Sequence, residues 1–558
     1  MSKNISKLSG RKGLEDNLFE RVKQPQANIG EVAERYLIGK STVYGSQTFY
    51  EFLDDGHRDK QAWVCNGSSC LCSGNQGLVR SQLEASLAPD EIGSMTCLGH
   101  CYDADAFHFR GRNYSGGRSA DIDQLVQKAV PDITAEELRS YSVTCTSQTA
   151  ILTDGNFQTT NEYTEALQTL LDQSRSAVIE TIKTSGLRGR GGAGFPAGVK
   201  WQSCMDVSAE TKYIVCNADE GDPGAFSDRY LLEQQSLRVI FGMLVAAWLA
   251  EAKLGVIYIR AEYPESVAVT RQTIAALQAE KLLGENILNQ GFSFDIKVIE
   301  GAGAYICGEE TALIASIEGR RAEVDVRPPF PTEQGLFKQP TILNNVETFA
   351  AIQRVLELGG ERFEAIGRGR STGTKLLSLD AGFNRPGIVE VEMGMALTTL
   401  VEDVGGGFRQ PTKAIHIGGP LGGLVPVAKL ADLTIDFESF SEAGFLLGHA
   451  SLVCIPESFA LIRYLEHLFE FTRVESCGKC FPCRLGSTRG QEMLSQAING
   501  KRLLKRSLLD DLLTTLQEGS LCALGGGLPL PVMNALQYFE AELSPYFESD
   551  DRIPVRSV

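Results

Sequence analysis

Four cysteines near the carboxyl end of the chain have the spacing of an iron–sulfur site. Cys477, Cys480 and Cys483 follow one another at three-residue intervals, and Cys522 comes later. Three thiolates on one loop can cap one face of a 4Fe–4S cube, and a distant thiolate can complete it. Four thiolates also suit a structural zinc ion, but such zinc sites usually take their ligands as two pairs. The spacing therefore favours a cluster that carries single electrons.

A first cysteine set, which precedes the second cysteine motif described above, lies in the first quarter of the chain. Cys65 and Cys70 form one pair, and Cys97 and Cys101 form another. Two pairs on separate loops suit a 2Fe–2S cluster in which each pair holds one iron. A structural zinc ion and unliganded buried thiols are the alternatives. Cys72 follows Cys70 closely and is either a spare thiol or an alternative ligand.

A glycine-rich segment lies between the two cysteine sets. Residues 186–201 read GLRGRGGAGFPAGVKW. Closely spaced glycines let backbone N–H groups approach a phosphate, and Arg188, Arg190 and Lys200 add positive charge. A Rossmann unit would need a strand directly before the glycines, whereas residues 176–185 have a helical pattern. The segment therefore predicts a phosphate-binding loop of another kind.

Two further segments carry polar residues of the kind that bind ligands. Residues 213–222, YIVCNADEGD, read as a strand that ends in an acidic turn, and ligands bind at strand ends in open α/β sheets. Residues 301–311, GAGAYICGEET, join glycines to Glu309 and Glu310. These paired carboxylates either begin a helix, where the helix dipole favours them, or accept hydrogen bonds from a ribose or an amide. The sequence leaves both roles open.

Composition limits the class of protein. A chain of 558 residues predicts several domains, and its formal net charge of −17 argues against binding to nucleic acid or to an anionic membrane surface. The most apolar stretch, residues 239–250, is too short to span a bilayer and predicts a buried helix. Fourteen cysteines, without a segment that resembles an export signal, predict reduced thiols and a cytoplasmic location without membrane insertion.

Five motifs together resemble one family, the NADH-binding flavoprotein subunit of respiratory complex I and its soluble relatives. Those relatives include the β subunits of NAD-dependent molybdenum or tungsten formate dehydrogenases and the diaphorase subunits of NAD-linked hydrogenases. The resemblance covers residues 160–546, and residues 65–101 also resemble the thioredoxin-like 2Fe–2S ferredoxin of a complex I partner subunit, here fused in front. The motifs are GRGGAGFPAGVKW (189–201), CNADEGDPGAFSDR (216–229), GAGAYICGEETAL (301–313), ILNNVET (342–348) and ESCGKCFPCRLG (475–486).

The resemblance implies site residues for each cofactor. FMN would be held by Gly189, Gly191, Gly192, Gly194, Lys200, Asn217, Asp219, Gly308, Asn344 and Asn345. The nicotinamide nucleotide would lie near Phe195, Glu220, Glu309, Glu310 and Phe330, and Tyr305 joins the cofactor-binding set. Glu220 and Glu310 would position the nucleotide, and no side chain is assigned a catalytic role because the chemistry is that of the flavin. The two cysteine sets match the cluster ligands.

Two departures from the family pattern bear on nucleotide binding. Many relatives have an aromatic residue shortly after the Lys-Trp pair, whereas this chain has Gln202, Ser203 and Cys204. Residues 321–327, RAEVDVR, lack the glycine that commonly follows the paired arginines. We therefore expect that the stacking of the nucleotide beside Lys200 differs from that in those relatives.

The resemblance also implies an α/β and α+β multidomain fold. We expect an N-terminal helical segment (1–40), a thioredoxin-like 2Fe–2S domain (41–120), a linker (121–159), an α/β FMN- and NADH-binding domain (160–370), a ubiquitin-like β-grasp domain (371–455) and a helical 4Fe–4S domain (456–558).

The expected function is exchange of hydride between NAD(H) and FMN, followed by single-electron transfer through the clusters. Short stretches such as IGGPLGG (417–423) are most similar to the formate dehydrogenase branch. That branch implies a large molybdopterin-containing catalytic subunit as partner, with a small ferredoxin-like subunit as a further candidate. The alternatives are a hydrogenase diaphorase subunit, a complex I NADH-binding subunit, and a zinc-stabilised scaffold without catalysis.

Overall fold

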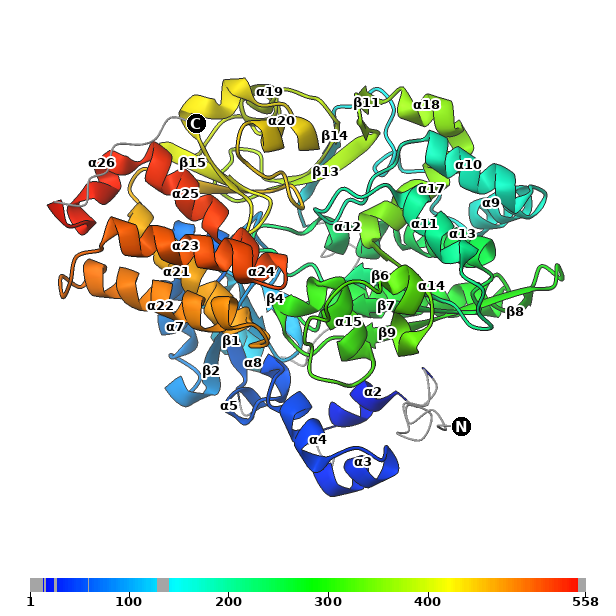
Figure 1. Ribbon diagram of the computed structural model, residues 1–558, viewed down its shortest axis with the longest axis horizontal. Coiled ribbons are helices and arrows are strands. Elements are labelled where there is room, and N and C mark those ends of the chain that lie inside the picture. Colours follow the sequence, from blue (N-terminus) through cyan, green and yellow to red (C-terminus); the bar gives the residue numbers. More distant parts are fainter. Residues whose placement is uncertain (1–13, 15–16, 25–27, 59, 128–139, 550–558) are drawn as a thin grey trace.

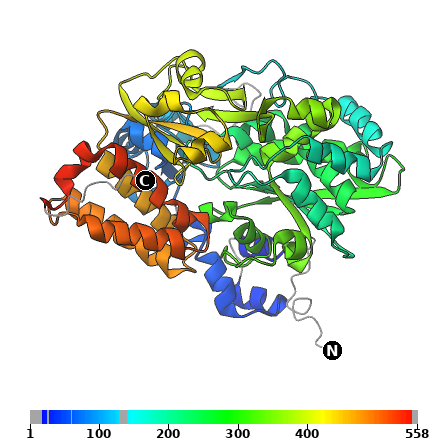
Figure 2. The ribbon, with the colours of Figure 1, turned by 45° about the horizontal axis from the view of Figure 1, so that its top comes forward.

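The computed structural model describes residues 14, 17–24, 28–58, 60–127 and 140–549. In this part of the chain the strands form three main sheets, and helices of the carboxyl-terminal region form a bundle. Figures 1 and 2 show the bundle at one side of the molecule and the central α/β domain at the other. No helix among the described residues is both long enough and apolar enough to cross a membrane.

The first helices pack against the central domain. They are α2 (Leu18–Val22), α3 (Ile29–Arg35), α4 (Lys40–Gln47) and α5 (Asp55–Arg58). The Asn17 side-chain amide donates to Ile317 O over 2.6 Å, and the Tyr50 hydroxyl donates to Arg320 O over 2.9 Å. The helical segment therefore runs past the expected boundary at residue 40, because α4 also docks on the central domain, with Ser46 Oγ donating to Gly319 O over 3.1 Å.

The first sheet has the strand order β2-β1-β3-β4. β1 (Ala62–Cys65) is parallel to β2 (Ile92–Met95) and antiparallel to β3 (Phe107–Phe109), and β4 (Arg112–Tyr114) follows β3. Helices α6 (Ser68–Ser73) and α7 (Gln76–Leu83) connect β1 to β2. Because β1 and β2 are parallel, the loops that follow them lie at the same edge of the sheet. Both pairs of the first cysteine set lie near this edge: Cys65 ends β1 and Cys70 is in α6, while Cys97 and Cys101 follow β2.

The second sheet, in the central domain, has the order β10-β6-β7-β9-β8. Strands β10, β6, β7 and β9 are parallel, and β8 (Gly284–Ile287) is an antiparallel edge strand. The parallel strands are β10 (Thr341–Asn345), β6 (Tyr213–Ala218), β7 (Leu254–Ile259) and β9 (Phe292–Glu300). Their carboxyl ends therefore share one edge, where ligands bind in folds of this class.

Helices cover both faces of this central sheet. They are α9 (Thr160–Leu171), α10 (Arg175–Thr184), α11 (Ala197–Asp206), α12 (Ser227–Gln234), α13 (Ser236–Ala250), α14 (Pro264–Ala279), α15 (Glu310–Ile317), α16 (Pro331–Gln334), α17 (Val346–Leu358) and α18 (Gly360–Glu364).

Helix α13 is the buried helix that the apolar stretch predicts. Its side chains from Arg238 to Ala250 are all buried. Gly242 lets α17 approach closely, since a Cβ atom at this position would lie 2.0 Å from Phe349 O. Only glycine is compatible with that backbone contact. The prediction of a buried helix at residues 239–250 is confirmed.

The third sheet has the order β16-β15-β17-β13-β14-β5. Its strands are β13 (Thr374–Leu379), β14 (Gly387–Glu392), β15 (Thr412–Ile417), β16 (Gly423–Pro426), β17 (Ser451–Pro456) and β5 (Ser142–Cys145), with α19 (Leu397–Thr399) and α20 (Phe437–Glu442) beside them. The structure differs here from the expected linker, because β5 comes from residues 121–159 and pairs in parallel with β14. Its side chains are mostly exposed, as at a sheet edge, so its sequence lacks the alternating pattern of a half-buried strand.

Glu390 on β14 fastens the segment that follows β5. Its buried carboxylate accepts hydrogen bonds from the N–H groups of Ile151 (2.7 Å), Leu152 (3.1 Å) and Thr153 (2.9 Å), and from the Thr374 hydroxyl (2.6 Å). A carboxylate suits this site because it only accepts hydrogen bonds.

We expect Glu390→Gln to destabilise the protein by about 1–3 kcal/mol, because the new amide N–H₂ would face backbone donors that lose their acceptor. Faster hydrogen exchange at residues 151–153, together with a lower unfolding temperature, would check this result. Glu402→Gln, at an exposed position, is the matched control. An equal fall in the unfolding temperature of the two variants would contradict the expectation.

The carboxyl-terminal region is a bundle of α21 (Leu461–Glu475), α22 (Phe481–Ile498), α23 (Arg506–Gly519), α24 (Ala523–Gly527), α25 (Pro529–Tyr538) and α26 (Glu540–Leu543). Its apolar core includes Leu465, Leu494 and Leu513. The four cysteines of the second motif lie on the loops and first turns at one end of these helices. The expected mixed α/β multidomain class with a helical carboxyl-terminal region is confirmed.

Candidate functional site

The glycine-rich loop closes on itself just before α11. Gly189 N donates to Phe195 O over 2.8 Å, and Ala197 N donates to Leu187 O over 2.9 Å. Gly192 and Gly194 adopt φ values of +111° and +61°, which favour glycine. The loop therefore presents backbone groups at the beginning of a helix, where anions are favoured.

Within this loop, Arg188 and Arg190 have protein groups as partners instead of a phosphate. Arg188 Nη1 lies 2.6 Å from Glu438 Oε1, and its guanidinium stacks over the Phe437 ring at 4.4 Å. Arg190 is buried, and its Nη2 donates to Thr372 O over 2.6 Å. The expectation that both arginines add positive charge for a phosphate is wrong, because they hold the loop against the third sheet and the helices beside it, here called the β-rich domain.

Lys200 is the cation of this loop that stays beside the expected nucleotide residues. Its Nζ lies 3.1 Å from Glu310 Oε2, and Arg327 Nη1 lies 2.8 Å from Glu310 Oε1. Burial alone would raise the pKa of Glu310, but Lys200 and Arg327 outweigh it and lower that pKa. Glu310 is therefore an ionised carboxylate held between two cations.

The predicted asparagines meet at the edge of the central sheet. Asn344 and Asn345 end β10, and Asn345 is in register with Asn217 on β6. Asn217 Nδ2 donates to Gly308 O over 2.8 Å, and Asn344 Oδ1 accepts from Trp201 Nε1 over 2.8 Å. The glycine loop also reaches this edge, because a Cβ atom at Gly191 would lie 3.0 Å from Asn345 Cβ.

Asp219 and Glu309 each leave a buried carboxylate oxygen without a hydrogen-bond partner in the described part of the chain. These atoms are Asp219 Oδ2 and Glu309 Oε1. The other Glu309 oxygen caps α15 by accepting from Thr311 N (2.9 Å) and Ala312 N (3.0 Å). Burial raises the pKa of Asp219 well above its usual range. Glu309 thus combines a helix cap with a free acceptor, two roles that the sequence left as alternatives.

The donor and acceptor groups at this edge fit FMN. The unpartnered oxygens of Asp219 and Glu309 can accept from the hydroxyl and N–H groups of a flavin nucleotide. A Cβ atom at Gly308 would lie 3.4 Å from Asp219 O and 3.8 Å from Asp219 Oδ2, at ordinary van der Waals distances, so a side chain there would occupy space beside the unpartnered oxygen. A buried acceptor without a partner is costly, so a bound donor would stabilise this arrangement.

Phe195 and Phe330 are large apolar side chains that remain about half exposed, at 55% and 51%. Phe330 directly precedes α16, and Phe195 is followed by Pro196 and then α11. Ser203 Oγ on α11 lies 3.4 Å from Thr332 Oγ1 on α16. The position where relatives carry an aromatic residue is therefore filled by a polar contact between helices. The two phenylalanines keep faces available for stacking on a base.

Tyr305 joins the central domain to the bundle. Its hydroxyl donates to Asp222 Oδ1 over 2.7 Å, its N–H donates to Glu475 Oε2 over 2.8 Å, and its ring packs edge-on against Phe471 at 4.9 Å. Burial raises the pKa of Glu475 to about 7. Tyr305 therefore lies between the expected flavin residues and the helix that leads to the second cysteine motif.

Glu220 is buried and caps α12. Its carboxylate accepts from Ser227 Oγ (3.1 Å), Asp228 N (2.9 Å) and Arg229 N (3.1 Å). Facing it is His449, which the sequence did not single out. His449 comes from the loop before β17 in another domain, so no local pattern connects it with Glu220.

The carboxyl-terminal cysteines converge at one end of the bundle. Cys477 and Cys483 are buried, and Cys480 and Cys522 are half-buried. Gly525 lets α24 approach α22, since a Cβ atom there would lie 2.7 Å from Cys483 Cβ. Burial raises the pKa of Cys483 to about 11 and that of Cys522 to about 12, and Cys477 contributes to both shifts. Thiols this close suit a cluster that binds them as thiolates.

The first cysteine set also comes together. Cys97 Sγ lies 3.3 Å from Cys101 Sγ, and the Cys65 thiol interacts with both Cys70 and Cys97. Gly67 N approaches Cys65 Sγ at 3.4 Å, as N–H groups do around cluster sulfurs.

Cys72 does not belong to the first cysteine set. Its buried side chain packs in the core of the carboxyl-terminal bundle, where Asp380 is its main charged neighbour. The alternative that Cys72 serves as a ligand is therefore not supported by its position.

Buried cations connect the first cysteine set with Glu220. Arg260 donates to Glu220 O over 2.5 Å and to Thr96 O over 3.2 Å, one residue before Cys97. Arg229 Nη1 donates to Gly99 O over 3.1 Å. The cysteine loop is thus fixed to the same turn that carries Glu220.

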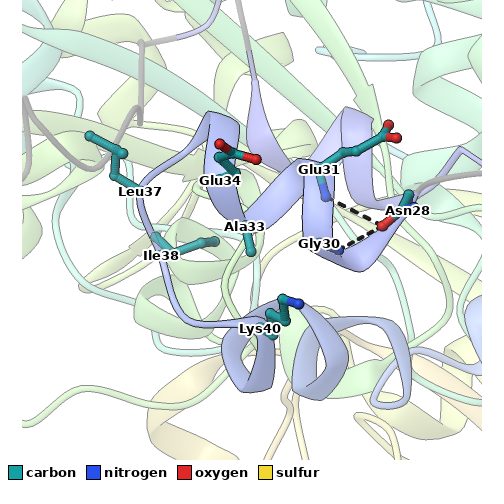
Figure 3. Close-up of a pocket in the computed structure, with 8 residues that line it drawn as sticks. All are labelled: Asn28, Gly30, Glu31, Ala33, Glu34, Leu37, Ile38 and Lys40. Carbon is teal, nitrogen blue, oxygen red and sulfur yellow. Dashed lines mark hydrogen bonds between the residues drawn. The ribbon is translucent and has the colours of Figure 1, made fainter.

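A separate hollow of about 540 Å³ lies on the N-terminal helices (Figure 3). At its rim Asn28 Oδ1 accepts from Gly30 N over 2.8 Å, which is a helix cap. It contains none of the predicted site residues, and we assign it no chemistry. Its lining consists of Asn28, Gly30, Glu31, Ala33, Glu34, Leu37, Ile38 and Lys40.

Comparison with protein families gives two matches. Residues 182–354 match the Nuo51 FMN-binding domain, and residues 463–546 match the NADH-ubiquinone oxidoreductase-F iron-sulfur binding region. The first match contains the glycine loop and all three predicted asparagines, and the second contains all four carboxyl-terminal cysteines.

Several curated proteins are similar to this chain. The HndC subunit of the NADP-reducing hydrogenase of Solidesulfovibrio fructosivorans is 40% identical, over 70% of this chain and 80% of that protein. The F 2 subunit of the NADH-quinone oxidoreductase of Rhizobium meliloti is 38% identical, over 71% of this chain and 95% of that protein. The alpha subunit of the NAD-reducing hydrogenase HoxS of Cupriavidus necator is 40% identical, over 69% of this chain and 65% of that protein.

A solved structure extends the similarity to nearly the whole chain. A chain of an NAD⁺-reducing [NiFe]-hydrogenase in the H₂-reduced state superposes with a TM-score of 0.83 at 26% identity. The match covers 95% of this chain and 92% of that chain. It therefore includes most of the residues before 182, which the two family matches leave out.

Proposed function

This chain belongs to the family of NADH-binding FMN and iron–sulfur subunits found in NADH-quinone oxidoreductase and NAD-reducing hydrogenase, and from that premise we propose that it is the NAD⁺-reducing β subunit of a molybdenum or tungsten formate dehydrogenase. The family membership establishes an NAD(H)-dependent flavin and iron–sulfur oxidoreductase subunit. The observation that carries the diaphorase role is that one chain brings the predicted flavin residues together at a sheet edge and also contains two converging sets of cysteines. The choice of the formate dehydrogenase branch is supported by the similarity of short stretches such as IGGPLGG (417–423) to that branch.

FMN, when bound, converts between the electron pair of a hydride and single electrons. The residues that would hold it are the glycines at 189, 191, 192, 194 and 308, with Lys200, Asn217, Asp219, Asn344 and Asn345. Phe195 and Phe330 would stack on the nucleotide, and Glu220, Glu309 and Glu310 would orient it. The unpartnered oxygens of Asp219 and Glu309 support this arrangement.

Cys477, Cys480, Cys483 and Cys522 would hold the 4Fe–4S cluster, and Cys65, Cys70, Cys97 and Cys101 a 2Fe–2S cluster. The connection of Thr96 and Gly99 to the Glu220 turn supports electron exchange between the 2Fe–2S site and the flavin. The partner would be a large molybdopterin-containing subunit in the cytoplasm. A hydrogenase diaphorase subunit is the second candidate, because the similar solved structure belongs to a [NiFe]-hydrogenase.

The test is to purify the chain from its native host with the subunits that remain bound to it. We expect FMN, about six iron atoms per chain for the two clusters, and a large subunit that contains molybdenum or tungsten. The complex should reduce NAD⁺ with formate. Nickel and reduction of NAD⁺ with hydrogen would favour the hydrogenase candidate. A colourless protein that contains zinc and no flavin would contradict both.

A further inference from the structure

His449 lies between two buried carboxylates. Its Nδ1 is 3.7 Å from Glu220 Oε1, and its Nε2 is 3.5 Å from Asp228 Oδ2. All three side chains are at most 6% exposed. Neither ring nitrogen has a hydrogen-bond partner in the part of the chain that the structure describes. A buried polar ring with both nitrogens aimed at carboxylates calls for an explanation.

The three side chains could in principle bind a metal ion, since one ligand atom from each can be chosen within 4.8 Å of the others. The orientation of the imidazole argues against this. Each ring nitrogen faces a different carboxylate, so an ion bound to one nitrogen would keep one carboxylate beside it, while the other carboxylate would pair with the second nitrogen. Glu220 already accepts bonds from Ser227 Oγ and two N–H groups of α12. An imidazolium with two N–H donors therefore fits between the two carboxylates better than a metal ion does.

We propose that His449 is a positively charged positioning residue of the flavin site, shared between the carboxylates of Glu220 and Asp228. The inference rests on the proposed function, because these carboxylates contact residues expected to hold FMN. Asp228 Oδ2 accepts from Asn345 Nδ2 over 2.6 Å. A Cβ atom at Gly192 would lie 3.8 Å from His449 N. His449, which belongs to the β-rich domain, thus places a positive charge at the edge of the central sheet where the flavin would lie.

Several other charged groups act on His449. Asp222 is a half-buried neighbour, and the positive charge of His449 counteracts the rise that burial causes in the pKa of Asp222. Lys375 opposes protonation of His449, but it is itself paired with Glu347. Burial lowers the pKa of His449, and Asp228 and Glu220 outweigh it, raising that pKa to about 9. Acidic neighbours therefore dominate its surroundings.

The charge on His449 has a consequence for Glu220. Burial and Asp228 raise the pKa of Glu220 to about 7, and His449 counteracts this rise. Removal of the imidazolium would leave two buried carboxylates close together, so the pKa of Glu220 would rise further and a fraction of this group would take up a proton. Glu220 would then lose part of the negative charge with which it is expected to orient the nucleotide, and this fractional proton would replace only part of the positive charge that the site loses.

The test compares the purified complex with two variants, His449→Gln and His467→Gln. His467 is the matched control, since it is equally buried at 6% and burial lowers its pKa to about 4, so it is neutral at the pH values used. A raised pKa in the folded state stabilises a protein below the unfolded pKa, and this stabilisation is lost as the pH rises through the folded value. Both variants are measured between about pH 7 and pH 10.

We expect the unfolding temperature of His449→Gln to lie below that of the wild type by about 2 °C or more at pH 7, and this gap to close as the pH rises past the pKa of His449. The gap for His467→Gln should stay constant. In spectroelectrochemical titrations, the flavin midpoint potential of His449→Gln should be more negative than that of the wild type at pH 7 and equal to it at the highest pH. The reason is that a nearby positive charge favours the added electrons.

Two results would overturn the inference. One is a gap in unfolding temperature that does not change with pH in this window, and the other is a flavin potential that His449→Gln leaves unchanged at pH 7. A loss of bound zinc or another metal ion in His449→Gln would show a metal site instead. If the wild-type complex contained no flavin, the proposed function would fail, while the unfolding measurements would still decide the charge of His449.

Discussion

Cys483→Ala is expected to remove about four iron atoms per chain and to slow electron transfer to the partner subunit by at least about 100-fold. Cys483 is buried in the first turn of α22, beside the other three cysteines of its set. Alanine keeps the Cβ atom that packs against Gly525, so the helices can keep their contact. Iron analysis and the electron paramagnetic resonance spectrum of the reduced complex would measure the loss.

Reduction of the flavin by NADH should survive this change, because the flavin residues belong to another domain. The expected pattern is therefore specific. NADH still bleaches the flavin absorbance and still reduces a small dye that accepts electrons from flavin, while reduction through the partner subunit is lost. A variant that loses flavin and both clusters together would indicate unfolding rather than removal of one ligand.

Cys204→Ala is the matched control for this prediction. Cys204 is fully buried in α11, and burial raises its pKa to about 11, as it does for Cys483. Its main charged neighbour is Lys212, not another thiol. Its replacement should leave the iron content unchanged. An equal loss of iron in both variants would contradict the assignment of Cys483 as a cluster ligand, and loss of zinc from Cys483→Ala would support the scaffold alternative.

The features that the sequence predicted well are those that a short segment determines by itself. The glycine loop is one of them, because the positive φ values of Gly192 and Gly194 and the closing bond from Gly189 involve neighbours in the chain. The cysteine spacings are another, because a tight loop brings Cys477, Cys480 and Cys483 together wherever the loop lies. The buried helix at residues 239–250 follows from its composition.

One more physical rule is needed to predict that segments far apart in the sequence come together. Parallel strands end at the same edge of a sheet, so the ends of β6 and β10 bring Asn217 and Asn345 into register. The same rule places the loops after β1 and β2 together, and with them Cys65 and Cys97. Without the strand order, the sequence shows only that these residues occur in suitable turns.

The partners of charged side chains were the feature that the sequence predicted least well. Arg188 and Arg190 occur in a phosphate-type loop, yet Glu438 and Thr372 in the β-rich domain take up their guanidinium groups. His449 could not be connected with Glu220, because their contact joins two domains. The partner of a long or buried ionic side chain depends on tertiary packing, which no local pattern encodes.

A buried ion pair is another contact that depends on tertiary packing, and it lies where the central domain meets the β-rich domain. Glu347 lies in the first turn of α17, and Lys375 lies on β13. Their side chains form an ion pair and are fully buried. Glu347 Oε1 also accepts from Leu376 N over 3.0 Å, and Lys375 Nζ donates to Leu376 O over 3.0 Å. The pair thus joins the strand of one domain to the helix of the other with its hydrogen bonds satisfied.

Lys375→Met is expected to destabilise the protein by about 3–5 kcal/mol, because it leaves the Glu347 carboxylate buried without a counter-charge. The double variant Lys375→Met/Glu347→Leu should recover much of this loss, since an apolar pair of similar volume avoids the desolvation of both charges. Unfolding temperature and the temperature at which FMN is released would measure both effects. Lys429→Met, which breaks an exposed pair with Asp432, should change neither temperature. If Lys375→Met were as stable as Lys429→Met, the two domains would not depend on this ion pair, and the β-rich domain would be held to the flavin site by its other contacts alone.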